Sequence, residues 1–171
     1  MTALNTSLLL NQALVSQENR LIKLTTSLGA DTLLPHRVVA YERLGRGYEY
    51  TIDCISTRDD IGLKKFIAQP VTLWVQQIDR AYLPMHGYVQ KIKRLGSDGQ
   101  FTFYQMAFAP WLNFLKFRKD ARIWQDKAAD DILSDVFGAH AEAMGNFRFD
   151  VRAPARQRSY CTQYETEVYC Q

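Results

Sequence analysis

The chain has 171 residues, of which 47% are hydrophobic and 23% are charged, and its formal net charge at pH 7 is +3. These values are ordinary for a globular protein of one or two domains, and the weak, dispersed positive charge argues against a dedicated nucleic-acid binder. The three cysteines lack CxxC spacing, which excludes a disulfide framework and a zinc site and fits folding in a reducing cytoplasm.

Residues 1–19 are predicted to be a lead-in to the folded part of the chain. Within them, residues 7–15 either form a short amphipathic helix or remain disordered. The apolar run at 8–10 is far too short for a signal peptide or a membrane span. We therefore expect a protein made in the cytoplasm without a cleaved signal.

After the lead-in, the sequence becomes rich in residues that favour β-structure. Loose alternation of apolar and polar residues predicts strands at 20–26, 37–43 and 48–56. The glycines at 29–31 and 45–47 predict the turns between them.

A short helix and a fourth strand are predicted next. Asp59 and Asp60 precede apolar residues at helical spacing, and Asp is a favourable N-cap residue. We predict a helix at 61–68 that ends before Pro70, followed by a strand at 71–77.

The strongest hairpin signal joins strands at 85–94 and 100–109 through the linker 95–99, which contains two glycines. The second strand is apolar on both faces, whereas a strand in a sheet with one solvent-exposed face needs apolar residues only on the other face. Its second face is therefore expected to be covered by another layer or another subunit. The candidate interface residues are Phe101, Phe103, Tyr104, Met106, Phe108 and Trp111.

The C-terminal third mixes helical and extended patterns. Its clearest signal is the i, i+3, i+4 spacing of apolar residues that follows Asp126 and Lys127. The predicted elements are a short helix at 111–117, an extended piece at 122–125, a helix at 128–137, and strands at 147–151 and 159–164.

No catalytic constellation stands out. His36, His86 and His140 lie on separate predicted elements, so we expect neither a metal site nor an acid–base pair among them. The acidic pairs at 59–60 and 130–131 sit at predicted helix starts, where they favour the helix dipole. The sequence predicts no catalytic, cofactor-binding or metal-binding residue, and hence no enzyme.

An alternative function arises from aromatic and basic residues on the predicted hairpin. Small β-barrels of the OB type bind single-stranded nucleic acid by stacking aromatic rings beside cations. The other interpretation places these rings in the core and the lysines in solvent. The residues concerned are Tyr88, Lys91, Lys93, Phe101, Phe103 and Tyr104.

Several segments together resemble the N-terminal region of VgrG, the spike protein of type VI secretion systems, which is itself similar to the hub protein of contractile phage tails. Their order and spacing agree from about residue 20 to residue 165. The segments are TTSLGADTL at 25–33, FIAQPVTL at 66–73 with MHGYV at 85–89, YQMAFAPWL at 104–112 with RIWQ at 122–125 and DIL at 131–133, and RSYCTQY at 158–164.

This resemblance implies a mainly β fold with an α+β part. An incomplete β-barrel tube domain of the phage tail hub type would occupy residues 20–117, and the beginning of an inserted α/β domain would occupy residues 118–171. The implied function is a structural hub that trimerises and caps the tube of Hcp hexamers during protein translocation. Implied partners are the homotrimer, Hcp, baseplate proteins and effector cargo, without nucleic acid or cofactor. Full-length relatives are secreted by the type VI system.

The end of the sequence departs from the family pattern. In the family, the run at 160–164 leads into an aromatic-rich helix and an acidic stretch, whereas residues 165–171 here read ETEVYCQ. The sequence therefore predicts a truncated form that lacks the closing strands, the second barrel and the needle. The alternative is natural divergence of the family.

Overall fold

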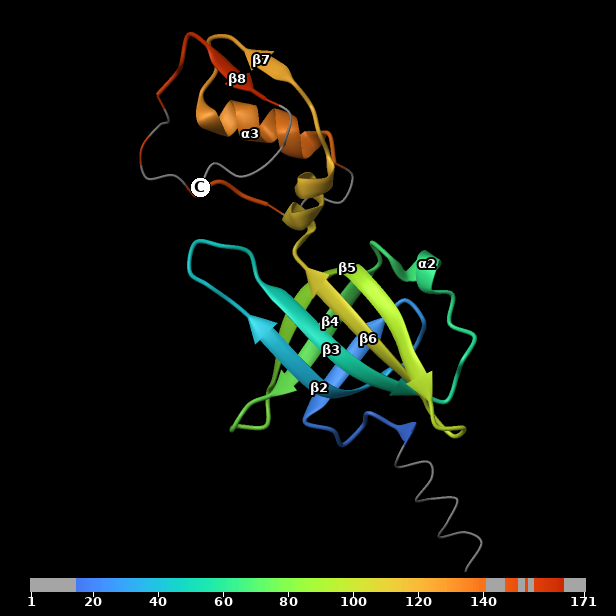
Figure 1. The fold of residues 1–171 in the computed structure, drawn as a ribbon. Helices are drawn as coiled ribbons and strands as arrows, with labels where there is room; N and C mark the ends of the chain where they lie inside the picture. Colours follow the sequence, from blue (N-terminus) through green and yellow to red (C-terminus); the bar gives the residue numbers. More distant parts are fainter. Residues whose placement is uncertain (1–14, 141–146, 151–152, 154–155, 165–171) are drawn as a thin grey trace, which may run out of the picture. The chain divides into compact units, whose positions relative to one another are not determined.

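This computed structural model describes residues 15–140, 147–150, 153 and 156–164 (Figure 1). The chain divides after Pro110 into two compact units. Most of the predicted lead-in lies outside the described residues. No helix in the described ranges is long and apolar enough to cross a lipid bilayer.

The first unit is a curled antiparallel sheet of six strands, with the order β1-β4-β5-β6-β3-β2. The predicted mainly β fold is confirmed, and every strand predicted in this unit is present. The strands are β1 (Ile22–Thr26), β2 (Leu34–Tyr41), β3 (Glu49–Ser56), β4 (Pro70–Gln76), β5 (Tyr82–Ser97) and β6 (Thr102–Ala109).

Alternate residues of the strands fill the inside of the curl. On β3 and β6, the inner rows are almost fully shielded from solvent, and the rings of Tyr50 and Phe108 stack with centroids 5.0 Å apart. Period-two burial of this kind hides one row of each strand in the core. The inner rows are Tyr50, Ile52, Cys54 and Ser56 on β3, and Tyr104, Met106 and Phe108 on β6.

The sheet has two edge strands, β1 and β2. Strand β2 begins three residues earlier than predicted, at Leu34, because the buried Leu34 anchors it to the core. Pro35 lies inside the strand, where an edge position tolerates a residue that has no N–H group. The register shifts between Pro35 and Arg37, so His36 forms a bulge.

The predicted helix at 61–68 is only one turn long, α2 (Leu63–Phe66), and the prediction of an aspartate N-cap is wrong. Gly62 precedes the helix without a side-chain cap. Asp60 instead accepts hydrogen bonds from the Arg58 guanidinium, 2.9 Å from Nε, and this contact lowers the pKa of the Asp60 carboxyl. The helix ends early because the Ala68 backbone is left-handed, with φ 63°, and its N–H donates to the Val89 carbonyl.

The predicted hairpin is confirmed as β5 and β6, which are joined by a tight turn at Asp98. The Asp98 carboxylate accepts the backbone N–H groups of Phe101 at 2.7 Å and Gln100 at 3.0 Å. These two donors hold the pKa of the carboxyl below its ordinary value. The turn chemistry therefore sets the register between the strands.

The second unit contains η1 (Trp111–Phe117), a 3₁₀-helix, and α3 (Ala129–Gly138). It also contains a small antiparallel pair, β7 (Arg122–Trp124) and β8 (Cys161–Gln163). These elements confirm the predicted helices at 111–117 and 128–137. They also confirm the predicted extended piece at 122–125 and the predicted strand at 159–164. The prediction that this unit begins an inserted α/β domain stays a prediction.

The start of α3 has the predicted acidic first turn. The Asp131 carboxylate accepts the N–H of Ala128 at 3.2 Å, which satisfies one of the free donors at the helix start. Lys127 pairs with Asp135 and lowers the pKa of that carboxyl. The Asp131 carboxylate therefore stabilises the start of the helix.

The predicted strand at 147–151 is wrong over residues 147–150, which form no regular structure. Phe147 instead packs against Phe137 and Phe149, with ring centroids 5.0 Å and 5.6 Å apart. The alternating pattern over residues 147–150 therefore corresponds to an aromatic cluster with Trp111 and not to a strand, since none of the strands in the described ranges pairs with it. Val151 lies outside the described residues.

We predict that Gly87→Ala destabilises the first unit by about 2 kcal/mol. A Cβ atom at this position would lie 2.6 Å from Cδ2 of Phe108 and 2.8 Å from the carbonyl oxygen of Ala109. Urea denaturation measures the free energy of unfolding. Gly62→Ala is the matched control, because its Cβ would meet only the flexible Lys65 side chain at 4.0 Å. Equal unfolding midpoints for the two variants would contradict this account of the packing.

We also predict that Cys54 resists alkylation in the folded protein. Burial raises the pKa of its thiol to about 12, and the charge of Asp53 adds to the rise. Near pH 8.5 the reactive thiolate is therefore scarce, and we expect labelling at least about a hundredfold slower than in denatured protein. Peptide mapping after iodoacetamide treatment provides the measurement, with the partly exposed Cys161 as internal control. Equal labelling rates at both cysteines would refute the prediction.

Candidate assembly surface

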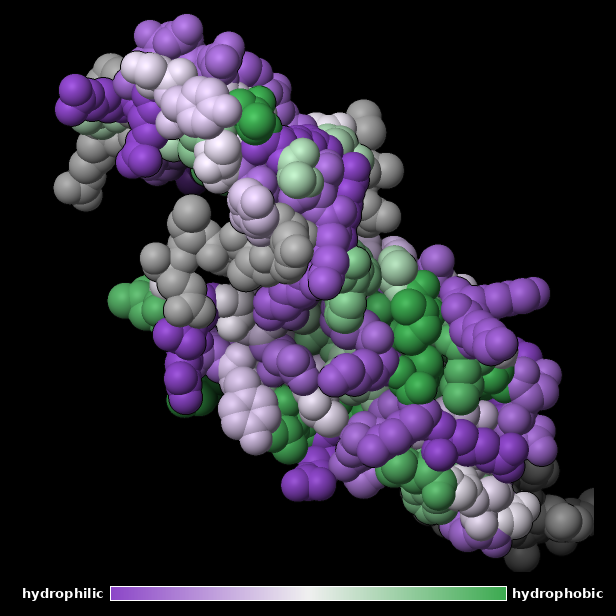
Figure 2. All heavy atoms as spheres, turned by 45° about the horizontal axis from the view of Figure 1, so that its top comes forward, coloured by the Kyte–Doolittle hydropathy of each residue, from purple (hydrophilic) through white to green (hydrophobic). Residues whose placement is uncertain are grey.

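The outer face of the curled sheet carries the residues that alternate with the core. On β3 this row is Thr51, Asp53 and Ile55, and all three are partly buried. Figure 2 shows hydrophobic side chains interspersed with hydrophilic ones on the visible face of the molecule. The visible face is therefore mixed in character, as surfaces that form non-obligate protein interfaces commonly are.

A polar row crosses four strands of this outer face. Arg37 on β2 lies opposite Asp53 on β3, which lies opposite Gln105 on β6, and Lys93 on β5 completes the row. Asp53 accepts from Arg37 Nη1 at 3.3 Å and from Gln105 Nε2 at 2.6 Å. The Asp53 side chain is only 15% exposed, whereas that of Arg37 is 66% exposed. The carboxylate is thus shielded and satisfied by its neighbours.

Next to this polar row lies a small apolar patch formed by Ile55 and Phe103. The two residues face each other in the β3–β6 register, and both are partly exposed. We call this pair the Phe103 patch. An apolar contact beside a satisfied polar row can contribute both burial and a defined orientation to a protein interface.

The structure separates the sequence-predicted interface residues into three groups. Tyr104, Met106 and Phe108 fill the interior, each at most 1% exposed, and no partner can reach them while the unit stays folded. Phe101 and Phe103 remain partly exposed. Trp111 belongs to the second unit, where its ring packs edge-on against Phe137.

The residues of the nucleic-acid alternative are divided in the same way. Lys91 and Lys93 are exposed on β5, and Phe103 lies on the same face. The Tyr104 ring lies in the core, and its hydroxyl donates to the Arg58 carbonyl at 3.1 Å, so it cannot stack on a base. One of the aromatic groups that suggested a nucleic-acid surface is therefore a core residue.

The histidines do not converge on one site. His36 is exposed in the bulge of β2, and His140 follows α3. His86 Nδ1 lies 3.0 Å from the Thr72 hydroxyl, and its ring meets Tyr88 edge-on. Within the described ranges, no group of three or more His, Cys, Asp or Glu side chains is arranged to hold a metal ion.

Comparison with known proteins identifies a family that this chain matches. Residues 41–168 match the family described as phage tail baseplate hub (GPD). The chain is 31% identical over 150 residues to the type VI secretion system spike protein VgrG1b of Pseudomonas aeruginosa, covering 88% of this chain and 20% of that protein. For VgrG1a of the same organism, the identity is 29%, with 86% and 23% covered. The chain spans about a fifth of the length of these curated relatives.

A solved structure has a similar fold. It is the Escherichia coli c3393 protein, described as a component of the type VI secretion system with structural similarity to the T4 bacteriophage tail proteins gp27 and gp5. The TM-score is 0.67 at 19% identity, over 83% of this chain and 39% of that one. The expected resemblance to the N-terminal region of VgrG is confirmed. Because the family match covers most of the sequence, this chain belongs to the phage tail baseplate hub family.

Proposed function

We propose that this chain is a structural hub element of a type VI secretion spike, which works by packing against other subunits and caps a tube of Hcp hexamers. The observation that carries the proposal is the family match over residues 41–168, which includes strands β3, β4, β5 and β6 of the curled sheet. The relatives are named as spike proteins, and this role needs shape and rigidity rather than bond chemistry.

The packing of the first unit suits a mechanical role. Antiparallel pairing ties each strand to its neighbours, and the β5–β6 pair is the longest in the sheet. Interiors packed in this way deform little under strain. A subunit of this kind can transmit force through its fold without any catalytic group.

The outer face offers a surface for contacts between copies. Three copies in a ring need a heterologous interface, in which two different surfaces of each subunit meet. The Phe103 patch, with Phe101 nearby in sequence, supplies an apolar centre, and the Arg37–Asp53–Gln105 row supplies a polar border. In this proposal the assembly partners are further copies, Hcp, baseplate proteins and effector cargo. Residues 118–171 would begin the inserted domain.

A binding experiment tests this proposal. Tagged chain is mixed with Hcp hexamers of the source organism, and captured Hcp and self-association are measured by pull-down and sedimentation velocity. We predict that Phe103→Lys weakens association about tenfold or more, because a charge replaces the apolar centre of an interface. Ile78→Lys is the control, since Ile78 is fully exposed in the turn between β4 and β5. Circular dichroism verifies the fold of both variants.

Two results would count against the proposal in different ways. If the wild-type chain stays monomeric and leaves Hcp unbound, the hub role is wrong for this chain. If the wild type binds and Phe103→Lys binds equally well, the hub role survives and the Phe103 patch is not its interface.

A further inference from the structure

The edge strand β1 has a free side that faces away from β4. The Leu21 carbonyl accepts the Gln76 N–H at 2.8 Å, so the backbone groups of Leu21, and by alternation those of Lys23 and Thr25, point toward β4. The backbone groups of Leu24 therefore point away from the sheet. Among the described strands, none pairs with β1 on this side.

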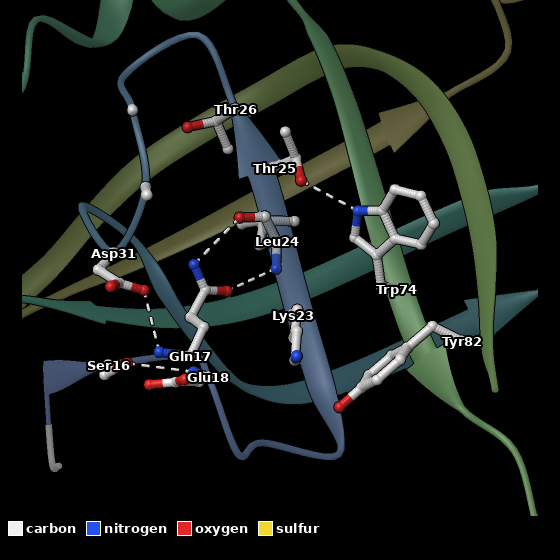
Figure 3. A pocket seen from close by; sticks show the side chains of 12 residues that line it. Ser16, Gln17, Glu18, Lys23, Leu24, Thr25, Thr26, Asp31, Trp74 and Tyr82 are labelled. Carbon is white, nitrogen blue, oxygen red and sulfur yellow. Dashed lines mark hydrogen bonds between the residues drawn. The ribbon is translucent and has the colours of Figure 1, made fainter. Parts of the chain in front are cut away.

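A single side chain occupies the middle of this free side. The carboxamide of Gln17 accepts the Leu24 N–H at 2.5 Å through Oε1 and donates to the Leu24 carbonyl at 3.2 Å through Nε2 (Figure 3). Residues that face each other as a hydrogen-bonded pair in antiparallel strands exchange the same two bonds. Gln17 thus takes the place that a residue of a neighbouring strand would occupy.

Two further contacts hold Gln17 in this position. Its own N–H donates to Asp31 Oδ1 at 2.9 Å, and Gln17 is only 8% exposed. Next along the edge, the Thr26 carbonyl accepts the Gly29 N–H at 3.3 Å. The outward backbone acceptors of both Leu24 and Thr26 are therefore already used within the chain.

A hollow borders β1 next to Gln17. Its volume is about 790 Å³, and its lining includes Lys23, Thr25, Trp74 and Tyr82 together with the chain segments 16–18 and 29–31 (Figure 3). The Lys23 ammonium lies 4.3 Å from the centre of the Tyr82 ring.

The sequence of β1 is compatible with pairing to itself. In an antiparallel pair centred on Leu24, the two Leu24 residues would exchange both backbone bonds, and Lys23 would face Thr25. Ile22 would face Thr26, so no like charges would meet. A twofold contact of this kind needs only one self-complementary strand.

We propose that Gln17 guards the β1 edge, and that its carboxamide keeps two copies of this chain from joining through their β1 strands. An unguarded edge strand is a template for such pairing, and proteins commonly block it with side chains. By blocking this edge, the Gln17 side chain directs association to other surfaces of the molecule. This inference rests on the geometry of β1 and does not depend on the proposed hub function.

The test compares Gln17→Ala and Gln17→Glu with the wild-type chain by sedimentation velocity over a wide range of concentration. The alanine removes both bonds. The glutamate places a carboxylate oxygen against the Leu24 carbonyl where Nε2 donates in the wild type, and this repulsion moves the side chain away from the edge. We expect each to lower the dissociation constant for self-association about tenfold or more. Gln77→Ala is the control, because Gln77 also donates to a strand carbonyl, that of Val75 at 3.3 Å, yet is exposed.

A second pair of variants tests the register. Thr25→Lys added to Gln17→Ala would face Lys23 of the other copy, and this repulsion should return association to the wild-type level. Thr25→Glu would face the same lysine with opposite charge and should preserve the association. Both changes remove the Thr25 hydroxyl that accepts the hydrogen bond from Trp74 Nε1.

The proposal is overturned if folded Gln17→Ala and Gln17→Glu both sediment as the wild type does. It is also overturned if Thr25→Lys and Thr25→Glu have the same effect on association. Should Gln17→Ala fail to fold by circular dichroism, the Gln17→Glu chain decides the outcome, and wild-type sedimentation of that chain refutes the guard.

Discussion

The burial of the inner rows of β3 and β6 is the constraint on which the first unit depends. Tyr104, Met106 and Phe108 can leave water only if the sheet curls over them, and Phe108 leaves no room for a side chain at position 87. Once these strands are committed to the core, their outer rows are set by alternation. The core therefore determines which residues remain for contact with other molecules.

The sequence predicted the strands of the first unit, the β5–β6 hairpin and α3 well, because each has a clear period and clear turn residues. It could not tell which row of β6 faces inward, since both rows carry apolar residues. It also predicted a helix cap at Asp59 and Asp60, whereas the Asp60 carboxylate accepts hydrogen bonds from Arg58. The role of Gln17 was not predictable from any local pattern, because its partner Leu24 is brought to it by the fold of the intervening chain.

The surface of the sheet divides into a region suited to association and an edge closed to it. The Phe103 patch lies beside Asp53, whose carboxylate is already paired with Arg37 and Gln105. The β1 edge, by contrast, has its central backbone groups taken up by Gln17. A protein that must assemble in one defined geometry gains from both features, because specificity requires weak alternatives as well as a strong intended contact.

Electron microscopy of Hcp tubes mixed with this chain tests the central claim most directly. If the chain is a hub element that caps the tube, particles should carry additional density at tube ends and none along the tube wall. Tubes with bare ends at saturating amounts of folded chain, or density spread along the wall, would contradict the claim.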